Sequence, residues 1–247
     1  MPRAVRRAVT AAIDNGVGRA GIAVVRALDR DVIGQAHHPR GSAGSVNGWM
    51  FAHRPSNRQR NSWAVSLLEV RPTDHVLEIG FGPGVAVAEL VRAGAGRVYG
   101  ADHSDVMLRQ ASRRNAAAIR AGRVSLIRAS VDQLPPALDG PFDAILAVNS
   151  LGFWPAPAER LAELRRRLAP AGRIAIVSQP RCTGATADTS RSAAREIENL
   201  LKEAGFTQIR TETLRLSPPV ICVLAADPGP NTSHTRKHDP SRWSASK

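Results

Sequence analysis

The stretch VLEIGFGPG at 76–84 constrains the fold more than any other part of this chain. Its first half is an apolar run, broken only by Glu78, that is typical of a buried strand, and a glycine turn follows at once. Residues 85–92 then resume with the apolar spacing of a helix. Glycines let the backbone turn sharply and let a ligand approach closely, while the first amides of the helix face that ligand. The stretch therefore predicts a cofactor-binding strand, turn and helix.

The glycine spacing discriminates between cofactors. A dinucleotide site requires G-x-G-x-x-G/A, but the third small position holds Val85 counted from Gly80, and Val87 counted from Gly82. The pattern present is acidic-x-G-x-G-x-G, which begins at Glu78. It resembles motif I of the class I S-adenosylmethionine (SAM) dependent methyltransferases.

Residues 71–226 alternate strand and helix signals, which predicts a mostly parallel sheet covered by helices on both faces. The expected strands are 75–80, 97–102, 123–128, 142–148, 172–178, 206–214 and 219–226. The expected helices are 62–70, 84–93, 104–119, 157–168 and one from an Asp188 cap through Ala204.

The last two expected strands are joined by only a few residues around Ser217 and Pro218. So short a link excludes a parallel crossover and predicts an antiparallel hairpin. The resemblance implies the same α/β architecture, a Rossmann-like methyltransferase fold with a seven-stranded, mostly parallel sheet and a C-terminal antiparallel hairpin. A dinucleotide-binding domain would not end in this way.

The flanking segments have a different composition. Two amphipathic stretches within 1–35 predict either a helical cap on the core or a basic surface that contacts anionic lipid, and 37–61 is expected to form loops. We therefore expect an N-terminal helical and loop extension over 1–70, a methyltransferase domain over 71–226 and a disordered tail over 227–247.

Asp102 ends the expected strand 97–102, twenty residues after Gly82. A doubly wound nucleotide site places an acid there for the ribose hydroxyls, although an acid can also cap the helix that begins near Ser104. The resemblance implies that Asp102 binds the ribose of SAM and that His103 flanks the adenosine.

The segment RASVDQLP at 128–135 resembles the family stretch G-D-A-x-x-L-P. Ser130 stands where the family usually has an acid for the adenine amine, and Asp132 follows two residues later. Either Ser130 accepts that hydrogen bond or Asp132 reaches in instead. Backbone groups of Ser130 and Val131 are further candidates.

The segment FDAILAVNSLGFWP at 142–155 is a buried strand that ends at Asn149. Ligands of open α/β sheets bind outside the carboxyl ends of the strands, so Asn149 is expected to border the reactive sulfonium. The N/D-P-P-Y/F signature of enzymes that methylate nucleic-acid bases is not present. Phe153 and Trp154 either pack under the next helix or line the acceptor pocket.

The resemblance implies a SAM site whose methionine end is supported by Glu78. The cofactor-binding candidates are Glu78, Gly80, Phe81, Gly82, Gly84, Asp102, His103, Ser130, Val131 and Asn149. No catalytic base stands out, and the acceptor-side candidates are His53, Arg54, Asn149 and Trp154.

The composition of the chain limits the classes of partner that we expect it to bind. The net charge of +13 is spread along the chain, which disfavours a dedicated polyanion site. Two cysteines make neither a disulfide framework nor a metal cluster. The longest apolar run, Val220 to Ala226, is far short of a membrane span, and no signal peptide is recognisable, so we expect a cytoplasmic protein.

Together the motifs predict a methyltransferase that uses SAM on a small-molecule or lipid-like acceptor. Two alternatives stay open: a nucleic-acid methyltransferase, which the charge favours and the missing signature opposes, and a non-catalytic, membrane-peripheral SAM-binding protein, which the amphipathic residues 1–35 favour.

Overall fold

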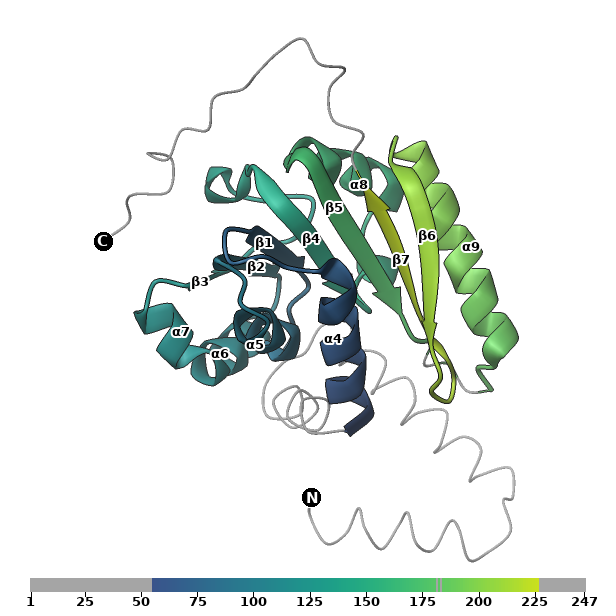
Figure 1. Cartoon of the computed structure of the whole chain (residues 1–247), viewed down its shortest axis with the longest axis horizontal. Coiled ribbons are helices and arrows are strands. Elements are labelled where there is room, and N and C mark those ends of the chain that lie inside the picture. The colour runs from purple at the N-terminus through teal and green to yellow at the C-terminus, as the bar shows by residue number, and fades with distance from the viewer. Residues whose placement is uncertain (1–54, 181, 183, 227–247) are drawn as a thin grey trace, which may run out of the picture.

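The computed structural model describes residues 55–180, 182 and 184–226, which form a seven-stranded sheet with helices on both faces (Figure 1). The strands are β1 (His75–Ile79), β2 (Arg97–Asp102), β3 (Val124–Arg128), β4 (Phe142–Val148), β5 (Leu168–Ser178), β6 (Thr207–Leu214) and β7 (Val220–Ala226). Their order is β3-β2-β1-β4-β5-β7-β6. Strands β1 to β5 are parallel, and β7 runs antiparallel to β5 and β6. The predicted parallel core and closing hairpin are confirmed.

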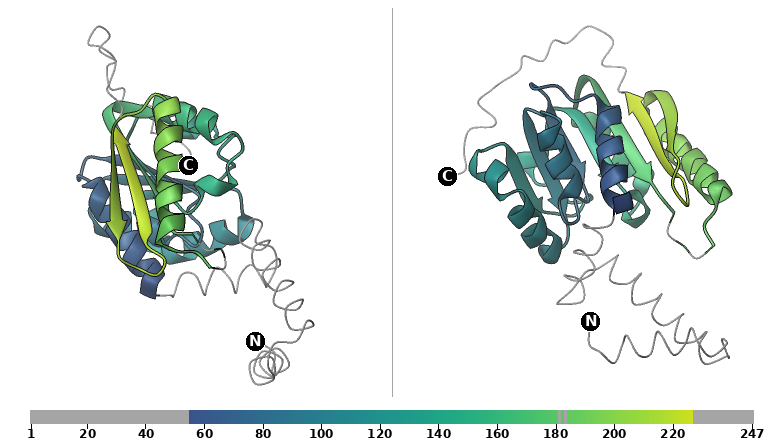
Figure 2. Two further views of the ribbon diagram at one scale, coloured as in Figure 1. Left: turned by 90° about the vertical axis from the view of Figure 1, so that its right-hand side faces the viewer. Right: turned by 60° about the horizontal axis from the view of Figure 1, so that its bottom comes forward.

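The helices form a layer on each face of the sheet (Figure 2). The first layer contains α4 (Pro55–Leu68), α5 (Val85–Arg92), α6 (Asp105–Arg114) and α7 (Ala116–Arg120). The second contains α8 (Pro157–Arg166) and α9 (Ala187–Glu203). Two short 3-10 turns, η1 (Pro136–Leu138) and η2 (Leu151–Phe153), lie in the loops on either side of β4.

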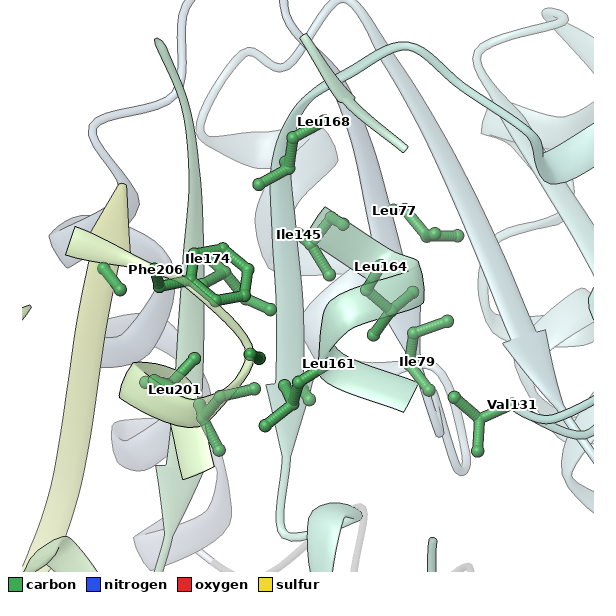
Figure 3. Close-up of a cluster of buried hydrophobic side chains, with 14 of the residues drawn as sticks. Leu77, Ile79, Val131, Ile145, Leu161, Leu164, Leu168, Ile174, Leu201 and Phe206 are labelled. Carbon is green, nitrogen blue, oxygen red and sulfur yellow. The ribbon is translucent and has the colours of Figure 1, made fainter. Parts of the chain in front are cut away.

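Both faces of the central strands are buried, which explains their nearly continuous apolar sequence. One core lies between the sheet and α4 to α7, and the other between the sheet and α8 and α9. Figure 3 shows part of the second core, where Leu161 and Leu164 of α8 and Leu201 of α9 lie close to Ile145 and Ile174 of the sheet.

The expected start of the first helix is wrong. The structure continues this helix back to Pro55, through residues that were expected to form a loop. Proline is compatible with the first turn of a helix. The buried residues of the early turns are the polar Asn57, Arg60 and Asn61, so the apolar periodicity begins only at Ala64.

Two further helix boundaries differ from the prediction. The helix expected over 104–119 is divided at Asn115, whose side-chain amide donates to the carbonyls of Gly84 and Ala111. The cap of α9 is Thr186 instead of Asp188, because its hydroxyl and that of Thr189 bond reciprocally to each other's backbone amides.

Strand β5 begins at Leu168, earlier than the predicted 172, because the chain pairs with β4 on both sides of an irregularity. Among the described residues, no helix is long and apolar enough to cross a membrane. The expectations for 1–35 and 227–247 concern residues outside the described ranges.

A buried ion pair joins α4 to the sheet at the amino-terminal end of β1. Arg173 Nη2 lies 2.6 Å from Asp74 Oδ2, and Asp74 is 4% exposed. The same guanidinium donates to the backbone carbonyls of Leu68, Glu69 and Asp143. One side chain therefore ties together the end of α4, the turn before β1, β4 and β5.

We expect Arg173→Met to lower the free energy of unfolding by about 3 kcal/mol, because it leaves a buried carboxylate without its cation. Urea denaturation followed by circular dichroism measures the change. The matched control is Arg191→Met, which removes an exposed pair with Asp188 and should cost less than about 1 kcal/mol. Equal stability of the two variants would contradict this role.

Candidate functional site

The three glycines of the turn after β1 differ in what surrounds them. Gly80 and Gly84 have φ of +76° and +74°, and a Cβ on either would collide with the protein itself. At Gly80 it would lie 2.4 Å from Cβ of Ser150, and at Gly84 2.7 Å from Cβ of Ala111. Gly82 also has positive φ, +51°, but a Cβ there would meet nothing within 4 Å. Gly82 therefore faces open space from which a ligand can approach the backbone.

Asp102 lies at the carboxyl end of β2 and is bonded to the glycine turn. Its Oδ2 accepts from the amide of Gly82 at 2.8 Å, and its Oδ1 accepts from the amide of Ser104 at 2.9 Å. Burial raises the pKa of Asp102, while these two amides and the neighbouring His103 oppose that shift. The carboxylate is thus held at the sheet edge and retains lone pairs for further hydrogen bonds.

His103 and Phe81 occupy different environments. The side chain of His103 is half exposed, and its Nδ1 lies 3.8 Å from Asp102 Oδ1. Phe81 is buried and packs over Gly100, where a Cβ would lie only 2.8 Å from the Phe81 ring. Phe81 can therefore offer only its backbone to a ligand.

Glu78 is a buried carboxyl group beneath the start of α5. It is 2% exposed, and within the described part of the chain its Oε2 has no hydrogen-bond partner. Burial raises the pKa of Glu78 well above its ordinary value, the charge of Asp102 raises it further, and a hydrogen bond from the Val87 amide lowers it. An unpartnered buried carboxyl oxygen is a suitable partner for a ligand cation such as an ammonium group.

The segment Ser130 to Asp132 begins two residues after the end of β3. The Ser130 hydroxyl donates a short hydrogen bond to Asp132 Oδ1, and the side chain of Val131 is buried. The amide of Ala129 donates to the carbonyl of Asp102 at 3.0 Å. The segment therefore begins immediately beside Asp102.

Asn149 and the aromatic pair follow β4. Asn149 has φ of +54°, and its Oδ1 accepts from the amide of Gln179 at 2.7 Å. This bond joins the ends of β4 and β5. Trp154 is buried in the core that also contains the apolar residues of α8, whereas Phe153 is 46% exposed. The structure thus separates the two aromatic side chains that the sequence placed together.

Two polar residues at this end of the sheet were not expected from the sequence. Gln179 Oε1 accepts from Arg60 Nη1 at 2.9 Å, and its Nε2 donates to the carbonyl of Pro218 at 3.0 Å. Gln179 follows β5 as Asn149 follows β4, so the same strand-end rule points to it. Arg60 is distant in sequence and gave no signal.

His53 and Arg54 lie outside the described residues. Among the residues that the structure describes, no group of three or more His, Cys, Asp or Glu side chains is placed to hold a metal ion.

We expect Glu78→Gln to stabilise the free protein at neutral pH by about 1 to 3 kcal/mol, because it removes a buried acid without a full set of partners. The folded-state pKa lies above the unfolded value, so folding takes up a proton and wild-type stability falls as pH rises through that interval. The advantage of the variant should therefore shrink as pH approaches 4.5 from above.

Urea midpoints measured between pH 4.5 and 8 provide the test. The control is Glu159→Gln, which changes an exposed acid on α8 and should alter stability by less than about 0.5 kcal/mol. A Glu78→Gln variant less stable than wild type at pH 8 would show that the carboxylate is satisfied in the folded protein.

Comparison with known proteins places this geometry in a family. Residues 76–172 match the methyltransferase domain family. An uncharacterised methyltransferase of Bacillus subtilis, YdaC, is 30% identical over 186 residues, which span 74% of this chain and 98% of YdaC.

Solved structures show the same fold. The N-methyltransferase NodS of Bradyrhizobium japonicum, in complex with S-adenosylhomocysteine, has a TM-score of 0.59 at 17% identity, over 82% of this chain and 97% of NodS. Phosphoethanolamine N-methyltransferase 2 of Haemonchus contortus has a TM-score of 0.55 at 16% identity, over 69% of this chain and 52% of that chain.

The glycine turn after β1, the acid at the end of β2, the reversed hairpin and the sequence match all indicate one family. The chain belongs to the class I SAM-dependent methyltransferases.

Proposed function

We propose that this enzyme methylates a small-molecule or lipid-like acceptor. The family establishes the methyl donor, and the acceptor is inferred from the end of β4. Asn149 is followed there by Ser150 and Leu151, so the chain lacks the Pro-Pro-aromatic segment that holds a nucleic-acid base. The half-exposed Phe153 offers an apolar surface next to this point. NodS and the Haemonchus enzyme, which share the fold, are both named as N-methyltransferases.

The observation that carries the cofactor site is the Asp102 carboxylate bonded to the Gly82 amide beside open space. In this site Asp102 accepts from the ribose hydroxyls of SAM, and the unpartnered oxygen of Glu78 accepts from the methionine ammonium. The backbone of Gly80 and Gly82 lies against the methionine part. These residues suit the charge and shape of the cofactor.

Bound SAM supplies an activated methyl group on a sulfonium. The protein's contribution is then to align the acceptor with that methyl and to exclude water. The ends of β4 and β5 are next to the proposed cofactor site, and the Asn149–Gln179 hydrogen bond holds them in register. A general base is required only when the acceptor must lose a proton.

We propose that 55–70, as part of α4 and the turn after it, belongs to the folded catalytic unit.

Calorimetry with S-adenosylhomocysteine tests the cofactor site. We expect Asp102→Ala to weaken binding about 100-fold, because two hydrogen bonds to a charged acceptor are lost. Gly82→Ala should weaken it at least about 10-fold, since the methyl group occupies the ligand's space. Wild-type affinity in both variants would overturn the assignment.

The control for Gly82→Ala is Gly122→Ala. Gly122 also has positive φ, +69°, and a Cβ there would meet nothing within 4 Å. Both variants carry similar backbone strain, so both should lose similar stability. Only Gly82→Ala should lose affinity for the cofactor, and equal losses would show that strain alone explains the effect.

The acceptor class is tested with methyl-labelled SAM and cell extract separated into small-molecule, lipid, nucleic-acid and protein fractions. Label in the small-molecule or lipid fraction is expected. The +13 charge is the argument for a nucleic-acid acceptor, and nuclease-sensitive label would support that alternative and refute the proposal.

A further inference from the structure

The turn after β3 lies on the side of the site where the adenine base must be. In the sheet β2 stands between β1 and β3, and the Ala129 amide bonds to the carbonyl of Asp102. With the ribose held at Asp102 and the methionine part directed toward Glu78 on β1, the base extends the other way. It therefore approaches Ser130 and Val131.

This turn is built rigidly. The amide of Gln133 donates to the carbonyl of Ser130 at 3.0 Å, and the Val131 side chain is anchored in the core. The side chain of Asp132 bends back to accept the Ser130 hydroxyl proton. That hydrogen bond lowers the pKa of Asp132, so this exposed acid is an anion at neutral pH.

The hydrogen bond determines what Ser130 can offer a ligand. A serine hydroxyl has one proton and two lone pairs, and here the proton is committed to Asp132. Ser130 then acts toward a ligand only as an acceptor. The adjacent amide of Val131 donates to no group within the described ranges, so it is available as a donor.

An acceptor next to a donor complements the edge of adenine, where the exocyclic amine donates and N1 accepts. We propose that Asp132 is a positioning residue that makes Ser130 an obligate acceptor for the adenine amine, with the Val131 amide donating to N1. A hydroxyl and its neighbouring carboxylate thus replace a single acid at this position. The proposal rests on the cofactor site assigned above.

The 6-oxo base hypoxanthine reverses this edge, because its O6 accepts and its N1–H donates. Wild-type protein should therefore bind S-adenosylhomocysteine at least about 30-fold more tightly than S-inosylhomocysteine. In Asp132→Ala the Ser130 hydroxyl can rotate and donate to O6. We expect this variant to bind S-adenosylhomocysteine about 3-fold more weakly than wild type does. The ratio of its affinities for S-adenosylhomocysteine and S-inosylhomocysteine should be about 10-fold smaller.

Calorimetry on the full chain measures both ligands with wild type, Asp132→Ala, Ser130→Ala and the double variant. Because Asp132 acts through Ser130, its substitution should have no further effect in the Ser130→Ala background. Ser130→Asp should restore discrimination without Asp132. The control is Asp188→Ala, which removes a remote exposed acid and should change neither affinity.

Unchanged discrimination in Asp132→Ala, or a full Asp132 effect in the absence of the Ser130 hydroxyl, would overturn the proposal. Asp132→Leu, which has a similar shape but cannot accept from the Ser130 hydroxyl, provides the same test if the alanine variant does not fold. Failure of wild type to bind S-adenosylhomocysteine would instead refute the cofactor site itself.

Discussion

The hydrogen bond from the Gly82 amide to Asp102 is the contact on which the proposed cofactor site depends. It joins the glycine turn after β1 to the end of β2, and the second carboxylate oxygen accepts from Ser104 at the start of α6. Three elements are thus held in register by one side chain. Because two backbone amides fix this carboxylate, we propose that it is preorganised to bind the ribose and need not be ordered when the cofactor binds.

The same arrangement places two carboxyl groups close together in a poorly hydrated region. Glu78 and Asp102 both have raised pKa values, mainly because of burial, and the charge of Asp102 raises the pKa of Glu78 further. The protein accepts a loss of stability here that a cation from the ligand can offset. We propose that this buried acid is maintained for binding the cofactor and not for folding, in line with the general tension between stability and function.

The opposite end of the proposed site contains more accessible groups, the half-buried Ser130 and the exposed Asp132. Ser130 and Asp132 lie on a short turn whose backbone is fixed by its own hydrogen bond and by the buried Val131. Their positions relative to Asp102 follow from the adjacency of β3 and β2 in the sheet. In the proposed site, recognition of the base therefore depends on hydrogen-bond direction, whereas recognition of the ammonium depends on charge.

Much of the fold follows from sequence because its central strands are buried on both faces and appear as apolar runs, and because short links allow only hairpins. The predicted helix bounds were wrong where tertiary contacts, and not local sequence signals, determine where a helix begins or breaks. Helix α4 begins early because Asn57, Arg60 and Asn61 are buried despite their polarity. The break after α6 comes from Asn115, whose amide bonds to Gly84 thirty-one residues away. Neither the early start of α4 nor the break after α6 corresponds to a periodic pattern in the sequence.

The sequence by itself determined the glycine turn after β1, the acid at the end of β2 and the reversed hairpin, because backbone conformation, strand burial and link length are local properties. Only the tertiary structure decided which groups meet. It buried Trp154 and exposed Phe153, joined Asn149 to Gln179, and directed the Ser130 proton to Asp132. The physical reason is that a side chain's partners depend on the packing of elements distant in sequence and on its rotamer, neither of which is encoded in residue spacing.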